Sequence, residues 1–268
     1  MRFGLHVPQL GALAEPDALV DLAERAEAMG WEGFFVWDHV MHTDAPGACD
    51  AWVTLGAIAV RTGLMTLGPL ITPLPRRRPW VAAVQATTVD RLSNGRTVFG
   101  VGIGTDRHRE FTALAEPATD DRMRAAMLDE GLDVITALWQ GTPVTHHGEH
   151  YTLDGVIEIP KPIQEPRIPI WCAAVWPHRP PLRRAARWDG VALAGQPVAP
   201  SEVAELCEYV DAHRTATTPF DVALPSSCAM TTALDEYADA GVTWWLHSIK
   251  PADELVVSQA TVDAGPPI

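Results

Sequence analysis

Eight short apolar segments recur along the chain, and each is followed by a stretch with helical periodicity. The segments are rich in β-branched and aromatic residues, which is typical of buried strands. They occupy residues 2–7, 33–37, 65–71, 97–102, 168–173, 190–193, 220–224 and 242–246. The helical stretches occupy residues 17–29, 51–61, 80–92, 121–139, 180–187, 201–213, 231–240 and 252–262. This alternation predicts an α/β fold, a (β/α)8 TIM barrel, with a doubly wound open sheet as the second choice.

One stretch interrupts this alternation. Residues 141–167 carry alternating side chains, turn glycines and prolines, without a helical repeat. The pattern predicts a β-hairpin with an extended loop between the fourth helix and the fifth strand. Because the stretch is too short for a second domain, we expect residues 1–268 to form a single domain.

Composition restricts the partners and the compartment. The net charge of −14 argues against nucleic acid or anionic lipid as a partner. The chain has no apolar stretch near the roughly 20 residues of a membrane helix, and MRFGLHVPQLG lacks the apolar core of a signal peptide. Cys49, Cys172, Cys207 and Cys228 show no CxxC spacing. We expect reduced thiols in a cytoplasmic enzyme.

The C-terminal ends of the barrel strands should carry the active site. Asp38 and His39 come directly after the second strand. His39 is predicted to be the catalytic acid or base, because an imidazole titrates near neutral pH. Asp38 would orient this ring or anchor the backbone. The alternative is a structural pair that pins a loop.

Two further strand ends are candidates for cofactor binding. The glycines between Gly100 and Gly104 allow a flat ring or a neighbouring backbone to approach closely. By itself this repeat fits a bend at the barrel rim better than a cofactor site. After the fifth strand, residues 175–179 lead into a helix whose N-terminus would suit a phosphate. An ordinary loop with surface arginines is the alternative.

Two clusters have weaker claims to a function. The arginines 76–78 follow the third strand, where they are either solvated or placed to receive the acidic tail of an anionic cofactor. The HHGEH segment at residues 146–150 looks metal-like but lacks the helical HExxH spacing of a zinc site. We therefore expect exposed histidines on a hairpin and predict no metal site.

Taken together, these segments resemble the bacterial luciferase-like family of flavin- and F420-dependent oxidoreductases. The matching stretches occur in family order over nearly the whole chain. They are MRFGLHVPQ, WEGFFVWDHV, ITPLPRRRPWVAAVQATTVDRLSNGR, FGVGIGTDRHREF, LDEGLDVITALWQGTPVTHHGEHY, PKPIQEPRIPIWCAA, RRAARWDGVAL and EYADAGVTWW. The resemblance implies a (β/α)8 barrel with an insertion, often dimeric, that holds FMN or coenzyme F420 at the strand C-termini. It implies oxidation or reduction of a small-molecule organic substrate.

The resemblance also assigns positions around the cofactor ring. Asp38 and His39 would lie beside the ring. Thr72 and the backbone of residues 68–70, which ends at Leu70, would lie behind it, where relatives often carry a bulge with a cis peptide. Gly104, Thr105 and Asp106 would border the reacting face.

The resemblance places the cofactor phosphate after the fifth strand. Val175 and Trp176 would donate N–H groups to it, where relatives usually have a glycine-rich turn. His178 and Arg179 would add charge and further N–H groups. We therefore expect Arg179→Ala to weaken cofactor binding and to leave the fold intact.

A departure from the family concerns the substrate. F420-dependent sugar-phosphate dehydrogenases carry a glutamate just after the fourth-strand glycines and a tryptophan a few residues past the histidine. This chain has Thr105 and Thr43 at those places. That substrate class is therefore not expected here.

The resemblance leaves cofactor and partners as expectations. FMN would make the chain a monooxygenase fed by a separate reductase, whereas F420 would make it a direct reductase or dehydrogenase. The arginines 76–78 favour F420, whose tail is polyanionic. A homodimer is expected. Two alternatives stay open: a flavin-binding protein without turnover, and a metal-dependent hydrolase built on Asp38, His39 and the hairpin histidines.

Overall fold

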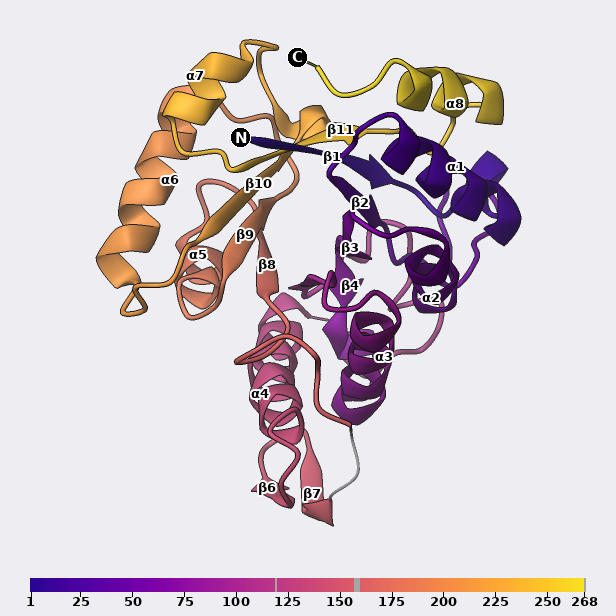
Figure 1. The fold of residues 1–268 in the computed structure, drawn as a ribbon. Coiled ribbons are helices and arrows are strands. Elements are labelled where there is room, and N and C mark those ends of the chain that lie inside the picture. The colour runs from indigo at the N-terminus through magenta and orange to yellow at the C-terminus, as the bar shows by residue number, and fades with distance from the viewer. Residues whose placement is uncertain (119, 157–159, 268) are drawn as a thin grey trace.

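The strands form one continuous parallel sheet that curves around a core, with helices on its outer side (Figure 1). The computed structural model describes residues 1–118, 120–156 and 160–267. The strand order within these residues is β3-β2-β1-β11-β10-β9-β8-β5-β4. The strands are β1 (Arg2–Val7), β2 (Gly33–Val36), β3 (Thr66–Pro69), β4 (Thr72–Pro73), β5 (Phe99–Gly102), β8 (Ile170–Ala174), β9 (Gly190–Leu193), β10 (Asp221–Pro225) and β11 (Trp244–Ser248).

Helices follow the strands as the alternation predicts. They are α1 (Pro16–Ala28), α2 (Ala51–Arg61), α3 (Pro79–Leu92), α4 (Asp121–Leu138), α5 (Arg179–Ala185), α6 (Pro200–His213), α7 (Leu234–Asp239) and α8 (Leu255–Asp263). Side-chain caps explain two of the starts, since Asp50 accepts the Val53 N–H and Asp120 accepts the Met123 N–H. Within the described residues, none of the helices is long and apolar enough to cross a membrane.

The barrel closes where β3 and β4 meet β5. The predicted strand 65–71 ends early, because β3 stops at Pro69 and a cis peptide between Leu70 and Ile71 precedes β4, which the sequence did not predict. Strand β3 pairs with β2, and β4 pairs with β5. An isolated parallel bridge between Leu67 and Thr97 joins β3 to the start of the β5 segment. The predicted (β/α)8 barrel is therefore confirmed, with a correction to its third strand.

The close approach of backbones at this junction explains two glycines. A Cβ on Gly68 would lie 2.0 Å from the Val98 carbonyl oxygen, and one on Gly100 would lie 2.2 Å from the Pro69 carbonyl oxygen. Neither distance is possible for a side chain. Of the two explanations for the glycine repeat, Gly100 therefore fits the approach of a neighbouring backbone.

Large aromatic side chains fill the inside of the barrel. Phe35, Trp171 and Trp244 are fully buried, and their ring centroids lie 5.3–5.8 Å apart. A second apolar layer packs between the strands and the helices. The interior below the rim is thus a packed core, as is normal for this barrel.

Several predicted boundaries are wrong by two or three residues, and local turns explain three of them. The predicted strand 242–246 begins only at Trp244, since the Val242 N–H still bonds the Tyr237 carbonyl at the end of α7. The seventh helix begins at Leu234 rather than at residue 231, where the Thr231 hydroxyl accepts the Ala233 N–H. Residues 250–253 form a turn ahead of α8.

The predicted hairpin is confirmed. Strands β6 (Val144–His147) and β7 (Thr152–Val156) pair antiparallel beside one end of α4 and project away from the barrel (Figure 1). Glu130 on α4 ties the hairpin down, because its carboxylate bonds the His146 ring at 3.0 Å and the Tyr151 N–H at 2.8 Å. Residues 157–159 of the predicted insertion lie outside the described residues.

Candidate active site

Asp38 is an anchor in this structure. Its carboxylate is buried just past the end of β2 and accepts hydrogen bonds from the Thr72 hydroxyl at 2.8 Å and from Arg77 Nη2 at 2.7 Å. Thr72 is fully buried and accepts a hydrogen bond from Trp52 Nε1 at 3.0 Å. Both side chains are thus satisfied by protein groups below the rim. Their predicted contact with a cofactor ring stays a prediction.

His39 stands at the rim with one ring nitrogen held. Its Nδ1 lies 2.7 Å from Glu110 Oε2, and its side chain is 20% exposed. Among the residues that the structure describes, no group hydrogen-bonds its Nε2. An imidazole held in this way has a fixed orientation and one nitrogen available for proton exchange.

Glu110 is a buried carboxylate that the sequence did not single out. Its side chain is 1% exposed and also bonds Arg76 Nη1 at 2.9 Å and the Val40 N–H at 2.8 Å. Burial alone would raise the pKa of Glu110, but the hydrogen bond and charge of His39, the charge of Arg76 and the Val40 N–H outweigh it and lower the pKa. The carboxylate is therefore ionised at neutral pH.

The arginine triplet differs from expectation. Arg76 bonds Glu110 and the Asp38 carbonyl oxygen, and Arg77 bonds the Asp38 carboxylate, so both point inward. Only Arg78 is exposed. The expectation that all three are solvated or receive an anionic tail is wrong for Arg76 and Arg77, because buried carboxylates use their charge.

His6 and Trp37 lie beside His39 at the ends of β1 and β2. The His6 and Trp37 rings have centroids 5.3 Å apart, and those of Trp37 and His39 are 5.7 Å apart. His6 Nε2 donates a hydrogen bond to the Leu70 carbonyl oxygen at 2.9 Å, so Nδ1 is the unprotonated nitrogen when the ring is neutral. Burial lowers the pKa of His6 to about 4, so this ring is neutral at pH 7. Within the described residues, His6 Nδ1 and Trp37 Nε1 have no hydrogen-bond partner.

Gly104 and Thr105 open the loop after β5. Gly104 has a positive φ of 75°, and a Cβ there would lie 2.9 Å from Pro73 and 3.0 Å from Phe111. Glycine is therefore required at this bend. Thr105 is exposed. Whether the pair borders a reacting face stays a prediction.

Most polar groups of the predicted phosphate-binding turn, residues 175–179, already contact other groups of the protein. The Trp176 ring is buried and donates from Nε1 to Glu202 at 3.1 Å. The Arg179 guanidinium lies 4.5 Å from the ring centroids of both Trp176 and Tyr209. The His178 N–H donates to the Val175 carbonyl oxygen at 2.9 Å, which corrects the expectation that this N–H is free for a phosphate.

Two more histidines approach His39 from neighbouring loops. The His42 and His108 ring centroids lie 5.5 and 5.7 Å from that of His39. Neither residue was predicted from the sequence. The only signal was their position, since both lie within about ten residues of a barrel strand's C-terminal end, where sites form in this fold.

The luciferase-like monooxygenase family model matches residues 1–264 of the chain. The chain belongs to this family. The F420-dependent glucose-6-phosphate dehydrogenase of Nakamurella multipartita is 34% identical over 165 residues, which are 60% of this chain and 48% of that protein. The chain thus spans about half the length of the curated relatives it matches.

Solved structures of the luciferase-like type share the whole fold. An F420-dependent secondary alcohol dehydrogenase in complex with an F420–acetone adduct superposes with a TM-score of 0.77 at 18% identity. The coenzyme F420-dependent tetrahydromethanopterin reductase of Methanopyrus kandleri gives 0.76 at 18% identity. Each comparison covers 98% of both chains. At this identity the likeness concerns the fold alone.

Proposed function

We propose that this luciferase-like chain is an oxidoreductase that uses a reduced flavin-type cofactor on a small organic substrate at the barrel rim. The observation that carries the proposal is the His39–Glu110 pair, in which an imidazole at a strand end has one nitrogen held at 2.7 Å and the other free among the described residues. F420 is the first candidate cofactor, because the Nakamurella relative and both solved structures bear it in their names. FMN, supplied by a separate reductase, is the second.

Two polar atoms at the rim are available to form hydrogen bonds with such a cofactor. His6 Nδ1 and Trp37 Nε1 lack protein partners within the described residues, and both lie next to His39. Buried polar atoms without a partner are rare in native proteins and point to a missing ligand. The ring would therefore contact His6, Trp37 and His39, with the Val175–Arg179 turn as the proposed phosphate end.

The residues of the chain handle the proton. A cofactor of this type carries the hydride or electrons when bound. With Nδ1–H donating to Glu110, the protonated ring of His39 can give its Nε2 proton to a substrate oxygen, the direction that a reduced cofactor would drive. The Glu110 carboxylate stabilises this imidazolium, and in the reverse direction, which needs an oxidised cofactor, the Nε2 lone pair can accept a proton from a substrate hydroxyl. Glu110 is thus a positioning residue and His39 the catalytic one.

A binding experiment followed by turnover tests the proposal. F420 and FMN are titrated side by side into the purified chain, and binding is followed by fluorescence quenching. Turnover is then measured with small alcohols, ketones and sugar phosphates. We expect His39→Ala to abolish turnover while cofactor binding is retained, with a dissociation constant raised by no more than about tenfold through the lost ring contact, and Glu110→Gln to lower kcat by about 10- to 100-fold. Binding without turnover in the wild type would instead favour a flavin-binding protein.

The hydrolase alternative gains no support from Asp38 or His146, two of the residues on which it rested. Asp38 is paired with Arg77 and His146 with Glu130, so two of the residues on which that alternative rested already have partners. For the substrate, we propose that glucose 6-phosphate is not used, because Thr43 and Thr105 stand where sugar-phosphate dehydrogenases carry tryptophan and glutamate.

We also propose a cytoplasmic homodimer. Four free cysteines support a reducing compartment. Adjacent helices α2 and α3 support the dimer, because they expose Val53, Val60, Val81 and Val84 by 44–74% on the outside of the barrel. Apolar patches on the surface of a soluble chain commonly mark interfaces.

A further inference from the structure

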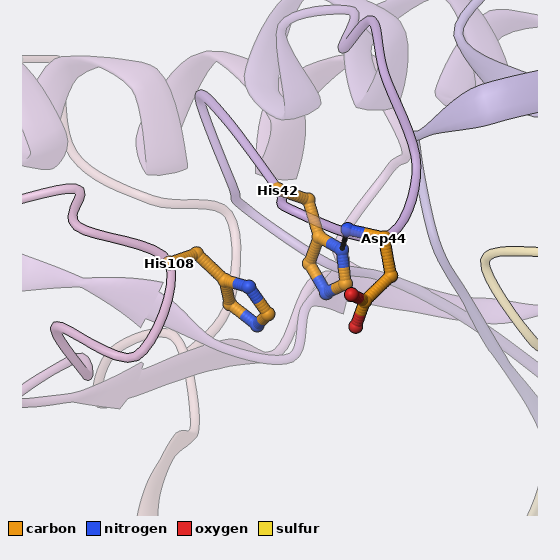
Figure 2. A group of neighbouring side chains, drawn as sticks. All are labelled: His42, Asp44 and His108. Atoms are coloured by element: carbon orange, nitrogen blue, oxygen red, sulfur yellow. Dashed lines mark hydrogen bonds between the residues drawn. The ribbon is translucent and has the colours of Figure 1, made fainter.

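Three side chains with metal-ligating atoms meet at the rim. His42 and Asp44 belong to the loop after β2, and His108 to the loop after β5 (Figure 2). One ligand atom from each residue can be chosen so that all lie within 4.8 Å of one another. Two loops that are far apart in the sequence thus bring together two imidazoles and a carboxylate.

The carboxylate of this cluster differs from the nearby carboxylates of Asp38 and Glu110. Asp38 is neutralised by Arg77 and Glu110 by Arg76. Asp44 has no ion-pair partner among the described residues. Its negative charge is therefore uncompensated by an arginine or lysine within the part of the chain that the structure describes.

Thr43 connects the cluster internally. Its hydroxyl lies 2.9 Å from His108 Nδ1 and donates to Asp44 Oδ1 at 3.2 Å, and its N–H donates to the same Nδ1 at 3.4 Å. Ligation through Nε2 of His108 therefore requires the other tautomer, in which Nδ1–H donates to the Thr43 hydroxyl and the long contact from the Thr43 N–H is given up. A hydrogen bond from the second ring nitrogen is the usual outer partner of a metal-bound histidine.

We propose that His42, Asp44 and His108 form a three-ligand site for a divalent cation of the zinc class, with its open positions beside His39. Two imidazoles and one carboxylate suit Zn²⁺, Co²⁺ or Ni²⁺ and disfavour Mg²⁺ and Ca²⁺, which prefer all-oxygen sites. Three protein ligands leave room for water or for an oxygen atom of a substrate. The site does not depend on the proposed redox function, because it can be loaded without cofactor.

Binding of a zinc ion requires one of the two imidazole rings to turn. The His42 and His108 rings are stacked, with centroids 3.7 Å apart and planes at 27°. Two nitrogens bound to one zinc ion at about 2.1 Å would lie about 3.4 Å apart with both lone pairs directed at the ion. One ring must therefore turn, and the ring of His42 is the better candidate. It is the more exposed, and the Asp44 N–H that it accepts at 3.2 Å is a long contact.

Calorimetry on the cofactor-free protein tests this site. Zinc chloride is titrated into chain stripped of metal, and we expect one ion per chain. Asp44→Ala and His108→Ala should each lower the affinity at least tenfold, and Thr43→Val by about 10- to 100-fold, as expected for an outer partner. Magnesium chloride should give no binding heat. Matched controls are His147→Ala on the exposed hairpin and Asp235→Ala on α7, which should bind like the wild type.

A second readout separates ligation from damage to the fold. Co²⁺ bound in place of zinc should give a visible absorption band that disappears in Asp44→Ala, an exposed position where substitution leaves the core untouched. Thermal unfolding of each variant identifies any loss caused by the buried His108. Unchanged zinc affinity in Asp44→Ala and His108→Ala, or a loss in His147→Ala, would overturn the proposal. Neither result bears on cofactor binding.

Discussion

At the scale of single residues, the ion pair of Asp38 and Arg77 holds the loop that carries His39. The Asp38 side chain is 2% exposed and that of Arg77 17%. Arg77→Ala leaves a buried carboxylate with only the Thr72 hydroxyl, so we expect the free energy of unfolding to fall by about 3–5 kcal/mol. Urea unfolding measures this loss. Exposed Arg78→Ala is the matched control, with an expected change within about 0.5 kcal/mol. Equal effects of the two substitutions would refute the anchoring role.

His6 should give the chain a specific sensitivity to acid. Its pKa is about 4 in the folded protein, against 6.5 ordinarily. Above pH 6.5 the ring is neutral in both states. Between pH 6.5 and 4 only the unfolded state takes up the proton, so the folded state loses up to roughly 3 kcal/mol of stability. We expect this loss between pH 7 and pH 4.5 to be smaller in His6→Gln and unchanged in His147→Gln, measured by urea unfolding at each pH. A parallel decline in all three proteins would contradict it.

Part of the site was predictable from the sequence, because strand ends in a barrel are set by local periodicity. His39 follows a strand whose burial pattern is evident in the chain. Glu110 was not predictable, since it reaches His39 from 71 positions away along an irregular loop. The orientation of the arginines 76–78 was not predictable for the same reason. Their composition predicts charge at the rim, but which of them turns inward depends on carboxylates supplied by other loops.

At the scale of elements, the start of α5 is where the structure most changes a prediction made from the sequence. The Arg179 guanidinium lies between the Trp176 and Tyr209 rings, so its loss removes packing as well as charge. The expectation that Arg179→Ala leaves the fold intact therefore needs correction. We expect this substitution to lower the free energy of unfolding by about 1–2 kcal/mol, the scale of partly desolvated cation–π contacts.

Arg179→Ala should still weaken binding of whichever cofactor the chain uses. We expect a loss of about 1–3 kcal/mol, typical of a hydrogen bond involving a charged group. Titration of F420 and FMN with the variant checks this, and Arg183→Ala, exposed on the same helix, is the control. Undiminished affinity together with the expected stability loss would mean that Arg179 only packs the turn. The cofactor phosphate would then bind elsewhere on the rim.

The strand and helix pattern was predictable at this scale for a physical reason. Each element buries one face against its neighbours, so its apolar residues repeat with the period of the element. The break in the third strand is not visible in this repeat, because it arises from contact with β5, and only the family resemblance indicated a bulge with a cis peptide there. Gly68 and Gly100 mark the close approach, but a glycine does not say which backbone approaches it.

At the scale of the whole molecule, the charge of −14 opposes association of two identical chains, so a dimer must rely on apolar contact. Val81 and Val84 lie on one face of α3, exposed by 46% and 44%. We expect the wild type to be a dimer by light scattering and the double variant Val81→Glu/Val84→Glu to be a monomer, because four added carboxylates would be buried at a twofold contact. Raising the salt concentration should tighten the wild-type dimer by screening its charge. Val256→Glu, exposed by 62% on α8, is the control and should stay dimeric. A wild-type monomer, or a double variant that still dimerises, would remove the α2–α3 face as the interface.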